Sequence, residues 1–457
     1  MRLRDSVERV YSQTLTPPAV ITGAPSTPRK WPGPLDDAAF YGVAGEIVRR
    51  IEPHTEADPA ALLICFLVAF GNAIGRGVYF LADGARHYGN LFAVLVGETS
   101  KGRKGTAWAR VLQRLIGVAG EWAENRVTGG LSSGEGLIWQ VRDPIHGTER
   151  DKKTKQTVTI VVDAGVADKR LMLVEAEFAS VLRLVERQGN TLSAIVRKAW
   201  EAGNLRSLTK NSPAKATGAH VSIIGDVTVD ELRRYLDRTE IANGFGNRFL
   251  WLCVRRSKCL PEGGQLDDDA FGDVTARIAD AIAFARTEQQ LYRNKAAKEL
   301  WAKVYPDLSE GKLGLAGALT GRAEAQVMRL ALVHAVLDCS SVIRVEHLTA
   351  GIALWEYCNE SVTWCFGDAT GDSVADVILN ALRGVGEAGL TRTEVSDLLG
   401  RNVSATRIAQ ALAALKARQL AVDLRESTDG PGRPVERWFA RASDTKETRK
   451  TKKGPTP

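Results

Sequence analysis

Short runs of apolar residues alternate with amphipathic stretches between residues 91 and 256 of the chain. A short apolar run bounded by turn residues is typical of a buried strand, and apolar residues three and four positions apart are typical of a helix that packs on a sheet. The expected strands are 91–96, 158–162, 171–174, 221–224 and 249–254. Their alternation with helical stretches predicts an α/β fold.

Helical patterns dominate on both sides of this region. Before it, apolar residues recur at helical spacing over 36–51, and Asp58 with Pro59 opens a second helix that runs to Gly71. After it, the pattern is mostly helical from about residue 267 to residue 366. The final module, 374–440, reads as three helices followed by two short strands, which is the order of elements in a winged helix.

The two ends of the chain differ in composition from the rest. The first 34 residues are rich in Pro-containing pairs, which are typical of an extended linker, and the last 17 carry six Lys/Arg against two acidic residues. We expect six parts: a flexible arm (1–34), a helical collar (35–90), an α/β core (91–266), a helical lid (267–366), a winged helix (374–440) and a disordered basic tail (441–457).

Bulk composition limits the possible classes of protein. The net charge is +7, but the tail supplies more than half of it, so nucleic-acid binding has to be argued from local clusters. Six cysteines without a CxxC pair argue against a zinc site and against a disulfide framework. The longest apolar run, 60–70, is shorter than a bilayer requires, and no charged leader precedes it. We expect a buried helix there, in a cytoplasmic protein without a membrane partner.

The stretch from Gly97 to Thr106, GETSKGRKGT, follows a predicted strand and precedes a predicted helix. A phosphate-binding P-loop has two glycines four residues apart, followed by lysine and a hydroxyl residue. Here Arg103 stands at the lysine position and Lys104 comes one residue later, so a loop longer by one residue is required for Lys104 to reach the phosphates of ATP. The alternative is a basic turn. The predicted nucleotide-binding residues are Gly97, Ser100, Lys101, Gly102, Arg103, Lys104, Gly105 and Thr106.

A P-loop enzyme also needs an acid at the end of a second buried strand, to hold Mg²⁺ and to orient water. Glu175 and Glu177 follow the apolar run 171–174, and alternation along an extended chain places both on one face. Glu175 is therefore predicted to hold Mg²⁺ together with Thr106, and Glu177 to orient the water. Asp163, which follows 158–162, is a competing strand-end acid.

Two arginine motifs resemble those of the hexameric minichromosome-maintenance helicases. They are residues 243–254, in which Arg248 directly precedes a strand, and residues 319–331, which contain Arg322 and, two turns further along a helix, Arg329. The resemblance implies that Arg248 is an arginine finger that reaches the γ-phosphate of a neighbouring subunit, and that Arg322 is a second sensor. A salt-bridged surface arginine and a solvated helix face are the respective alternatives.

The same resemblance assigns two further stretches. Residues 219–226 are a candidate sensor strand that ends at Asp226. The preceding stretch, 204–217, stands where such helicases carry a hairpin that projects into the ring channel, and it contains Arg206, Lys210 and Lys215 without any acid. Contacts of these side chains with DNA phosphates are expected to be sequence-tolerant and sensitive to salt. A solvated basic loop is the alternative.

A closer resemblance covers about residues 40–366. The motifs that carry it are 97–106, 131–137, 168–175, 242–251 and 255–264. They resemble a family of phage- and plasmid-type P-loop proteins that often stand beside primase-polymerase domains or are fused to them. This resemblance implies replication helicase activity and a primase or initiator as partner.

The third helix of the C-terminal module supplies further candidate DNA contacts. Arg401 and Arg407 lie at or near its start, where a recognition helix meets DNA. The module as a whole has nine basic and eight acidic residues, so docking to DNA and docking to a protein both remain open.

Together these patterns predict an AAA+-type P-loop ATPase with a helical collar, a helical lid and a C-terminal winged helix. ATP and Mg²⁺ are the expected cofactors, and a homo-oligomeric ring, as a hexamer, is expected to move on single-stranded or forked DNA. The alternative is a non-motor replication initiator or loader that binds nucleotide with little turnover. An NTPase that acts in defence against foreign DNA is a third possibility.

Overall fold

The structure is a computed structural model that describes residues 30–441 except 100–101, 151–155, 188, 208–213, 237–239, 241–242, 268, 312–313, 368–369, 371 and 427–434. Most of the expected arm, the expected tail beyond 441 and the candidate residues Ser100, Lys101 and Lys210 therefore lie outside the described residues. Contacts divide the chain into two compact units. The larger is residues 30–369, and the described part of the smaller is 370–441.

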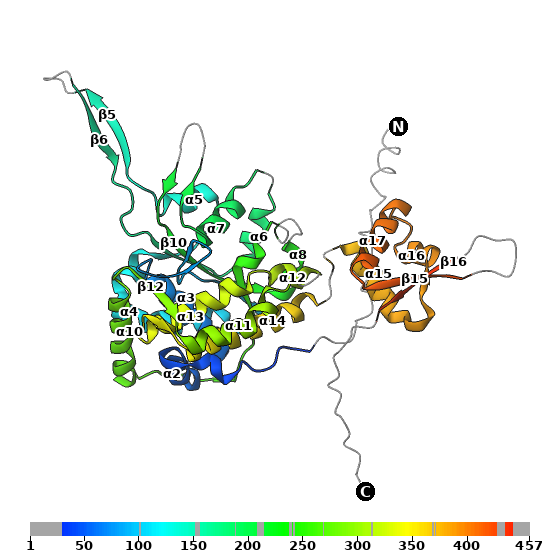
Figure 1. The fold of residues 1–457 in the computed structure, drawn as a ribbon, viewed down its shortest axis with the longest axis horizontal. Coiled ribbons are helices and arrows are strands. Elements are labelled where there is room, and N and C mark those ends of the chain that lie inside the picture. Colours follow the sequence, from blue (N-terminus) through cyan, green and yellow to red (C-terminus); the bar gives the residue numbers. More distant parts are fainter. Residues whose placement is uncertain are drawn as a thin grey trace, which may run out of the picture. The chain divides into compact units, whose positions relative to one another are not determined.

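A five-stranded sheet lies at the centre of the larger unit (Figure 1). Its order is β11 (Phe249–Cys253), β3 (Phe92–Gly97), β10 (His220–Thr228), β7 (Arg170–Glu175) and β4 (Val127–Thr128), and every neighbouring pair is parallel. The carboxyl ends of the strands therefore meet at one edge of the sheet, and the amino ends meet at the opposite edge. The predicted α/β fold is confirmed.

Helices cover both faces of this sheet because its strands are apolar on both sides. In β3, Ala93 and Leu95 belong to one buried cluster, whereas Phe92, Val94 and Val96 belong to another. The first cluster includes α3 (Pro59–Ala73) and α4 (Lys104–Asn125). The second includes α5 (Gly134–Trp139), α6 (Phe178–Val185), α7 (Leu192–Trp200) and α8 (Val229–Tyr235). The buried helix predicted at 60–70 is confirmed as α3, since every residue after its first is buried.

The expected division into a helical collar and a helical lid is wrong in part, because four short strands form a second sheet. Its order is β13 (Val342–Ile343), β12 (Gln289–Arg293), β1 (Val78–Ala82) and β2 (Ala85–His87). β1 pairs in parallel with β12, which comes from the segment expected to be the lid. The segments before and after the central sheet therefore share one layer of structure.

Helices make up the rest of these two segments. They are α2 (Gly42–Ile51), α10 (Gly272–Phe284), α11 (Lys295–Ser309), α12 (Gly314–Leu319), α13 (Ala323–Leu337) and α14 (Val345–Phe366), with short 3-10 turns η1 (Asp37–Phe40), η2 (Glu52–His54), η4 (Gly246–Arg248) and η5 (Asp269–Phe271). In the described part of the chain, no helix is both long and apolar enough to cross a membrane.

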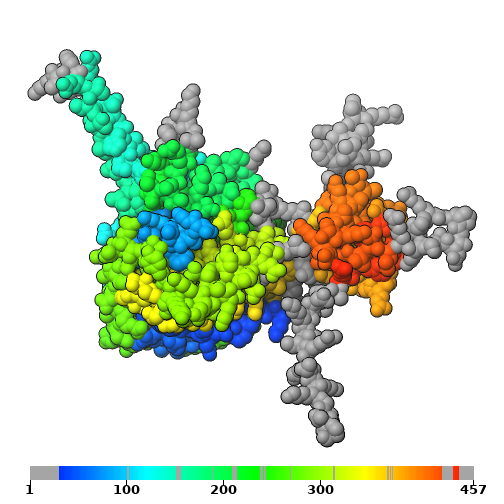
Figure 2. Space-filling view, in the orientation of Figure 1, coloured from blue at the N-terminus to red at the C-terminus, as the bar shows by residue number. Residues whose placement is uncertain are grey.

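Two antiparallel hairpins are inserted before strands of the central sheet, at its amino edge. β5 (Ile145–Arg150) pairs with β6 (Thr157–Asp163) before β7, and β8 (Leu205–Arg206) pairs with β9 (Lys215–Ala216) before β10. The β5–β6 hairpin projects from the surface (Figures 1 and 2), and its residues are largely exposed. The run 158–162 is therefore a strand, as predicted, but the inference that it belongs to the sheet is wrong. The two-residue β4 is the fifth strand.

The smaller unit contains α15 (Ser373–Val385), η6 (Gly386–Ala388), β14 (Leu390–Thr391), α16 (Arg392–Leu398), α17 (Ala405–Ala417), β15 (Ala421–Glu426) and β16 (Val435–Ala440). The strands form an antiparallel sheet in the order β14-β16-β15. Ile378, Leu412 and Trp438 are members of its own buried cluster. The unit therefore has a core independent of the larger one.

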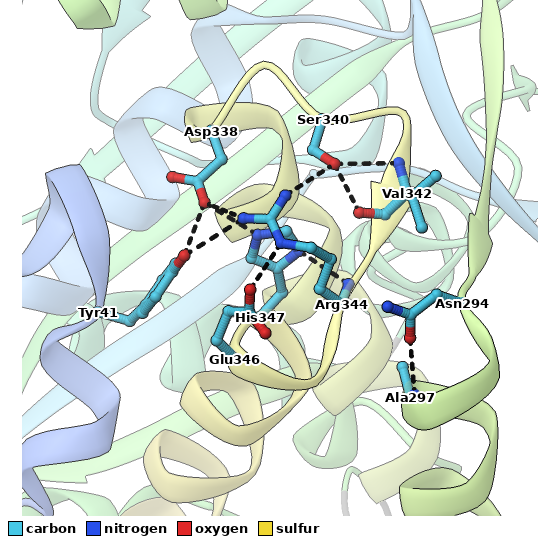
Figure 3. Close-up of polar contacts among 9 residues, drawn as sticks. All are labelled: Tyr41, Asn294, Ala297, Asp338, Ser340, Val342, Arg344, Glu346 and His347. Carbon is cyan, nitrogen blue, oxygen red and sulfur yellow. Dashed lines mark hydrogen bonds and ion pairs between the residues drawn. The ribbon is translucent and has the colours of Figure 1, made fainter.

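A polar network joins the start of α2 to the loop between α13 and α14 (Figure 3). Asp338 accepts hydrogen bonds from the Tyr41 hydroxyl at 2.8 Å and from Arg344 at 2.6 Å, and its Oδ2 lies 3.1 Å from His347 Nε2. Arg344 N–H donates to His347 Nδ1 at 3.1 Å. Burial opposes the charged carboxylate, but His347, Tyr41 and Arg344 outweigh it and hold the pKa of Asp338 at about 2.

Replacing this carboxylate should destabilise the protein in a pH-dependent way. Because the pKa of Asp338 is lower in the folded chain than in the unfolded chain, its stabilising effect is present above pH 4 and is lost as pH falls toward 2. Asp338→Asn should lower the free energy of unfolding by about 2 kcal/mol at pH 7. Urea unfolding from pH 7 down to pH 3 measures this. A difference that does not shrink below pH 4 would contradict the assignment.

Candidate functional site

The predicted phosphate loop joins β3 to α4, at the carboxyl edge of the central sheet. β3 ends at Gly97, and α4 begins at Lys104. Within the loop, Gly102 N–H donates to Thr99 O at 3.4 Å, and Arg103 has the left-handed backbone angle φ 54°. The first N–H groups of a helix lack partners within the helix and attract anions. The strand, loop and helix that a phosphate site requires are therefore present, in the predicted positions.

Lys104, and not Arg103, points back over this loop. The Lys104 ammonium donates to Thr99 O at 3.3 Å and lies 2.9 Å from where a Cβ on Gly97 would stand. Arg103 turns away, and its Nε lies 2.7 Å from Glu56 Oε2. Lys104 therefore occupies the position of the loop lysine, one residue later than in the usual spacing. Burial lowers the pKa of Lys104, and Asp226 and Glu231 oppose that shift.

Asp226 is the acid that faces Lys104. It lies on β10, beside Leu95 of β3, and its Oδ2 is 3.9 Å from where a Cβ on Gly105 would stand. Burial raises the pKa of Asp226 to about 7, and Lys104 moderates the shift. Glu231 completes this group from the first turn of α8, where it forms a capping box with Thr228. The structure therefore brings one lysine of α4 together with two acids of the continuous β10–α8 segment.

The two predicted strand-end glutamates lie differently from the expectation. Glu175 ends β7 and accepts a hydrogen bond from Leu131 N–H at 2.8 Å. The chain then turns, and Glu177 becomes the exposed residue that precedes α6. The prediction that both carboxylates share one face of an extended strand is wrong. Burial raises the pKa of Glu175, while the N–H groups of Leu131 and Gly130 lower it.

Glu175 and Asp226 also belong to different faces of the sheet. In β7, Leu171 and Leu173 belong to the cluster of α5 to α8, and alternation places Glu175 on that side. In β10, Ile224 belongs to the cluster of α3 and α4, so Asp226 is on the side of α4. Of these two strand acids, Asp226 is therefore the one on the side of α4. The competing acid Asp163 is excluded, because it lies at the base of the β5–β6 hairpin and binds Arg142.

The donors at this edge are suitable for Mg²⁺. Carboxylates and hydroxyls are the hard oxygen ligands that this ion requires, and Mg²⁺ usually binds one or two carboxylates together with substrate phosphates. Thr106 in the first turn of α4 and Asp226 satisfy that description. No group of three or more His, Cys, Asp and Glu able to hold a metal without phosphate occurs among the described residues.

Arg248 lies at the opposite edge of the sheet, directly before β11. Its side chain is only 7% exposed, donates to Gly244 O at 2.5 Å and forms an ion pair with Glu201. Arg322 precedes α13 instead of lying on it, and its side chain is 3.5 Å from the same Glu201 oxygen. The structure therefore brings the two arginines together, but it does not present Arg248 as a projecting finger.

The hairpin residues meet at Asp143, which sequence reasoning did not single out. Asp143 N–H donates to Lys215 O at 2.8 Å, and its carboxylate accepts from Thr217 and Lys169. Arg206 is exposed, and Lys215 is exposed at 3.8 Å from Asp143. These contacts tie the base of the β8–β9 hairpin to that of the β5–β6 hairpin.

An exposed tryptophan, also missed from the sequence, lies close to these hairpins. Trp139 ends α5 and is 49% exposed, and the Arg142 guanidinium lies 4.0 Å from its ring centroid. Aromatic rings of this kind stack on nucleic-acid bases. No spacing rule identifies a single tryptophan, because its exposure depends on the fold.

The two candidate arginines of the smaller unit already have acidic partners. Arg401 Nε lies 2.7 Å from Asp397, and Arg407 lies 2.5 Å from Asp372. Each ion pair reduces the charge that is free to meet a phosphate. Arg407 of α17 and Arg401, which precedes that helix, are therefore weaker candidates for nucleic-acid contact than Arg206.

No protein-family model matches this chain, and no curated protein matches it. The α/β fold and the geometry of the two sheet edges therefore carry the functional argument.

The raised pKa of Asp226 gives a stability prediction of opposite sign to that for Asp338. A carboxyl with a raised pKa in the folded state favours folding at low pH, and that contribution is lost as pH rises through about 7. Asp226→Asn should therefore raise the free energy of unfolding by on the order of 2–4 kcal/mol at pH 8. The gain should vanish near pH 4. Urea unfolding at both pH values measures it, and an equal shift at both would exclude a buried carboxylate beside Lys104.

Proposed function

We propose that this chain is a P-loop ATPase of the AAA+ type that hydrolyses ATP with Mg²⁺ and couples hydrolysis to movement on DNA. The observation that carries the proposal is the position of Lys104, which folds over the glycine loop at the end of β3 and faces Asp226. A basic turn without a ligand would have no reason to bury its lysine beside an acid while the preceding arginine pairs at the surface.

The order of strands supports the same proposal. A sensor side chain has to reach both the terminal phosphate and the attacking water, so its strand has to lie between the phosphate-loop strand and the acid strand. β10, which carries Asp226, lies between β3 and β7. This strand order supports the assignment of Asp226 as the expected sensor.

Several side chains at the carboxyl edge have separate roles in the proposed reaction. Lys104 and the N–H groups at the start of α4 bind phosphate oxygens, and Thr106 with Asp226 hold Mg²⁺, which supplies charge stabilisation to the phosphoryl group that is transferred. Glu231 favours the charged form of Lys104 against the effect of burial. Glu177 and Glu175 remain candidates for orienting the water, with Glu175 fixed by the N–H of Leu131.

Arg248 and Arg322 support a ring of subunits. They converge on Glu201 at the amino edge of the sheet, whereas Lys104 lies at the carboxyl edge. The five residues of β11 correspond to about 16 Å along the strand, which is too far for Arg248 to serve the phosphate site of its own chain. The two arginines therefore act on a nucleotide bound to a second copy, in a head-to-tail ring. We expect this ring to contain six subunits.

DNA contacts are proposed for the hairpins at the amino edge. Arg206 and Lys215 offer charge, and Trp139 offers a surface for stacking, which together suit single-stranded DNA. The smaller unit has the helices and antiparallel strands of a winged helix. Because its arginines are paired, we assign it to docking on a replication partner such as a primase or initiator, or to auxiliary contacts with DNA.

A replication initiator or loader that binds nucleotide with little turnover is the second candidate. Two observations favour it: backbone N–H groups already occupy Glu175, and Arg248 is paired within its own chain. The rate of ATP hydrolysis decides between the two functions.

ATP hydrolysis at low salt, with and without single-stranded DNA, is the direct test. Lys104→Ala should reduce turnover by about a hundredfold or more, because the loop loses its phosphate-binding cation. Arg103→Ala should change turnover by less than about threefold, because the Arg103 side chain is half-exposed and pairs with Glu56 instead of folding over the loop. Reversal of this order would mean that the usual P-loop spacing holds after all. If the folded wild type hydrolyses ATP no faster than Lys104→Ala, the ATPase is rejected and the replication initiator is the remaining candidate.

Complementation between two inactive variants tests the trans role of Arg248. Lys104→Ala lacks its own phosphate site but retains the arginine, and Arg248→Ala has the converse defect. An equal mixture should recover turnover at about a quarter of its sites, where an intact loop meets an intact arginine from the next subunit. Neither variant alone should hydrolyse ATP. No recovery in mixed rings confirmed by size-exclusion chromatography would show that Arg248 acts within its own chain or not at all.

A further inference from the structure

Positive charge exceeds negative charge around the end of α7. Glu201 forms an ion pair with Arg248, and Arg322 lies 3.5 Å from the same carboxylate oxygen. Arg329 is fully buried with its guanidinium 3.8 Å from the centroid of the Trp200 ring, and it donates to Trp200 O at 2.7 Å and to Asn90 O at 2.7 Å. Two guanidinium groups thus contact one carboxylate, and a third is buried against Trp200, the residue before it.

The arginines retain unused hydrogen-bonding capacity. The Nε atoms of Arg248 and Arg329 are both buried without a hydrogen-bond partner, within the part of the chain that the structure describes. Burial lowers the pKa of Arg329 to about 9, and the charges of Arg76, Arg322 and Arg248 add to that shift. The cluster is therefore incompletely neutralised by its own chain, and it suits an anion with more than one charge.

Glu201 is the part of this cluster that is able to move. It follows the last residue of α7, and the negative end of a helix dipole disfavours a carboxylate there. Its side chain is 45% exposed and that of Arg322 is 39% exposed, so both reach solvent. Arg248, in contrast, is fixed by Gly244 O and Asn247 Oδ1. Rotation of Glu201 toward solvent would uncover two arginines that are already positioned.

We propose that Glu201 is an internal substitute for phosphate. In the single chain its carboxylate occupies the anion position between Arg248 and Arg322, and the terminal phosphate of ATP on a second copy takes that position when the copies assemble. The inference rests on the proposed ATPase, and it adds a residue that no motif indicates. Because Glu201 competes with the incoming phosphate, it sets the protein concentration at which turnover begins.

Inorganic tripolyphosphate tests the anion position without hydrolysis. In the Lys104→Ala chain, whose own phosphate loop is disabled, Glu201→Gln should increase tripolyphosphate affinity by about tenfold or more, because a competing charge close to two arginines is removed. Adding Arg322→Gln should abolish the gain. Glu288→Gln removes a surface carboxylate that binds Arg86 elsewhere, and it should have no effect. Calorimetry measures the affinities.

Turnover by the chain with an intact Lys104 gives the second readout. Glu201→Gln should lower the protein concentration for half-maximal ATP hydrolysis by about five- to tenfold, by the same loss of competition. Glu201→Asp, whose shorter side chain reaches the arginines less well, should give a smaller shift in that concentration. It also provides a second test in case the Gln variant does not fold. Unchanged tripolyphosphate affinity in the folded Glu201→Gln chain, or a gain that persists with Arg322→Gln, would overturn the proposal. Absence of ATP hydrolysis in the wild type would instead reject the ATPase, while the tripolyphosphate measurement would still decide the role of Glu201.

Discussion

The parallel pairing of the central sheet is the constraint on which the rest of the structure depends. Because all five strands run in one direction, the turns that follow them gather at one edge and the turns that precede them gather at the other. Lys104, Asp226 and Glu175 lie at the carboxyl edge, while Arg248, Glu201 and the bases of both hairpins lie at the amino edge. The lysine and acids of the predicted phosphate loop are thereby separated from the paired arginines within one chain.

Local patterns were enough to predict the elements that build the phosphate loop. β3 and α4 follow from a short apolar run, a glycine-rich stretch and helical spacing, all of which are contiguous in sequence. The sequence offers both Arg103 and Lys104 as candidates, and only the structure shows Arg103 turned toward Glu56. The second sheet could not be predicted in this way, since β1 and β12 pair across about two hundred residues and each alone is too short to stand out.

The errors have identifiable physical causes. The run 158–162 is as apolar as a core strand, yet it lies in an exposed hairpin, because composition does not report which surfaces meet. β4 has only two residues, too few for any periodicity. Glu177 was assigned by extending strand alternation past Glu175, where the chain turns into α6. Glu201 carries no local signal, since its role depends on two arginines that are distant in sequence.

Separation of the two edges has a consequence for how such a protein is controlled. Under the proposed function, a chain with its phosphate site and its arginines at opposite edges is unable to complete a catalytic site alone, so activity requires a neighbour. An uncompensated group of arginines would also be costly to bury in the meantime. The proposed role of Glu201 resolves that conflict: its carboxylate lowers the cost of burying the arginines in the single chain, and a multiply charged phosphate would displace it. Stability of the monomer and dependence on assembly then follow from the same ion pair.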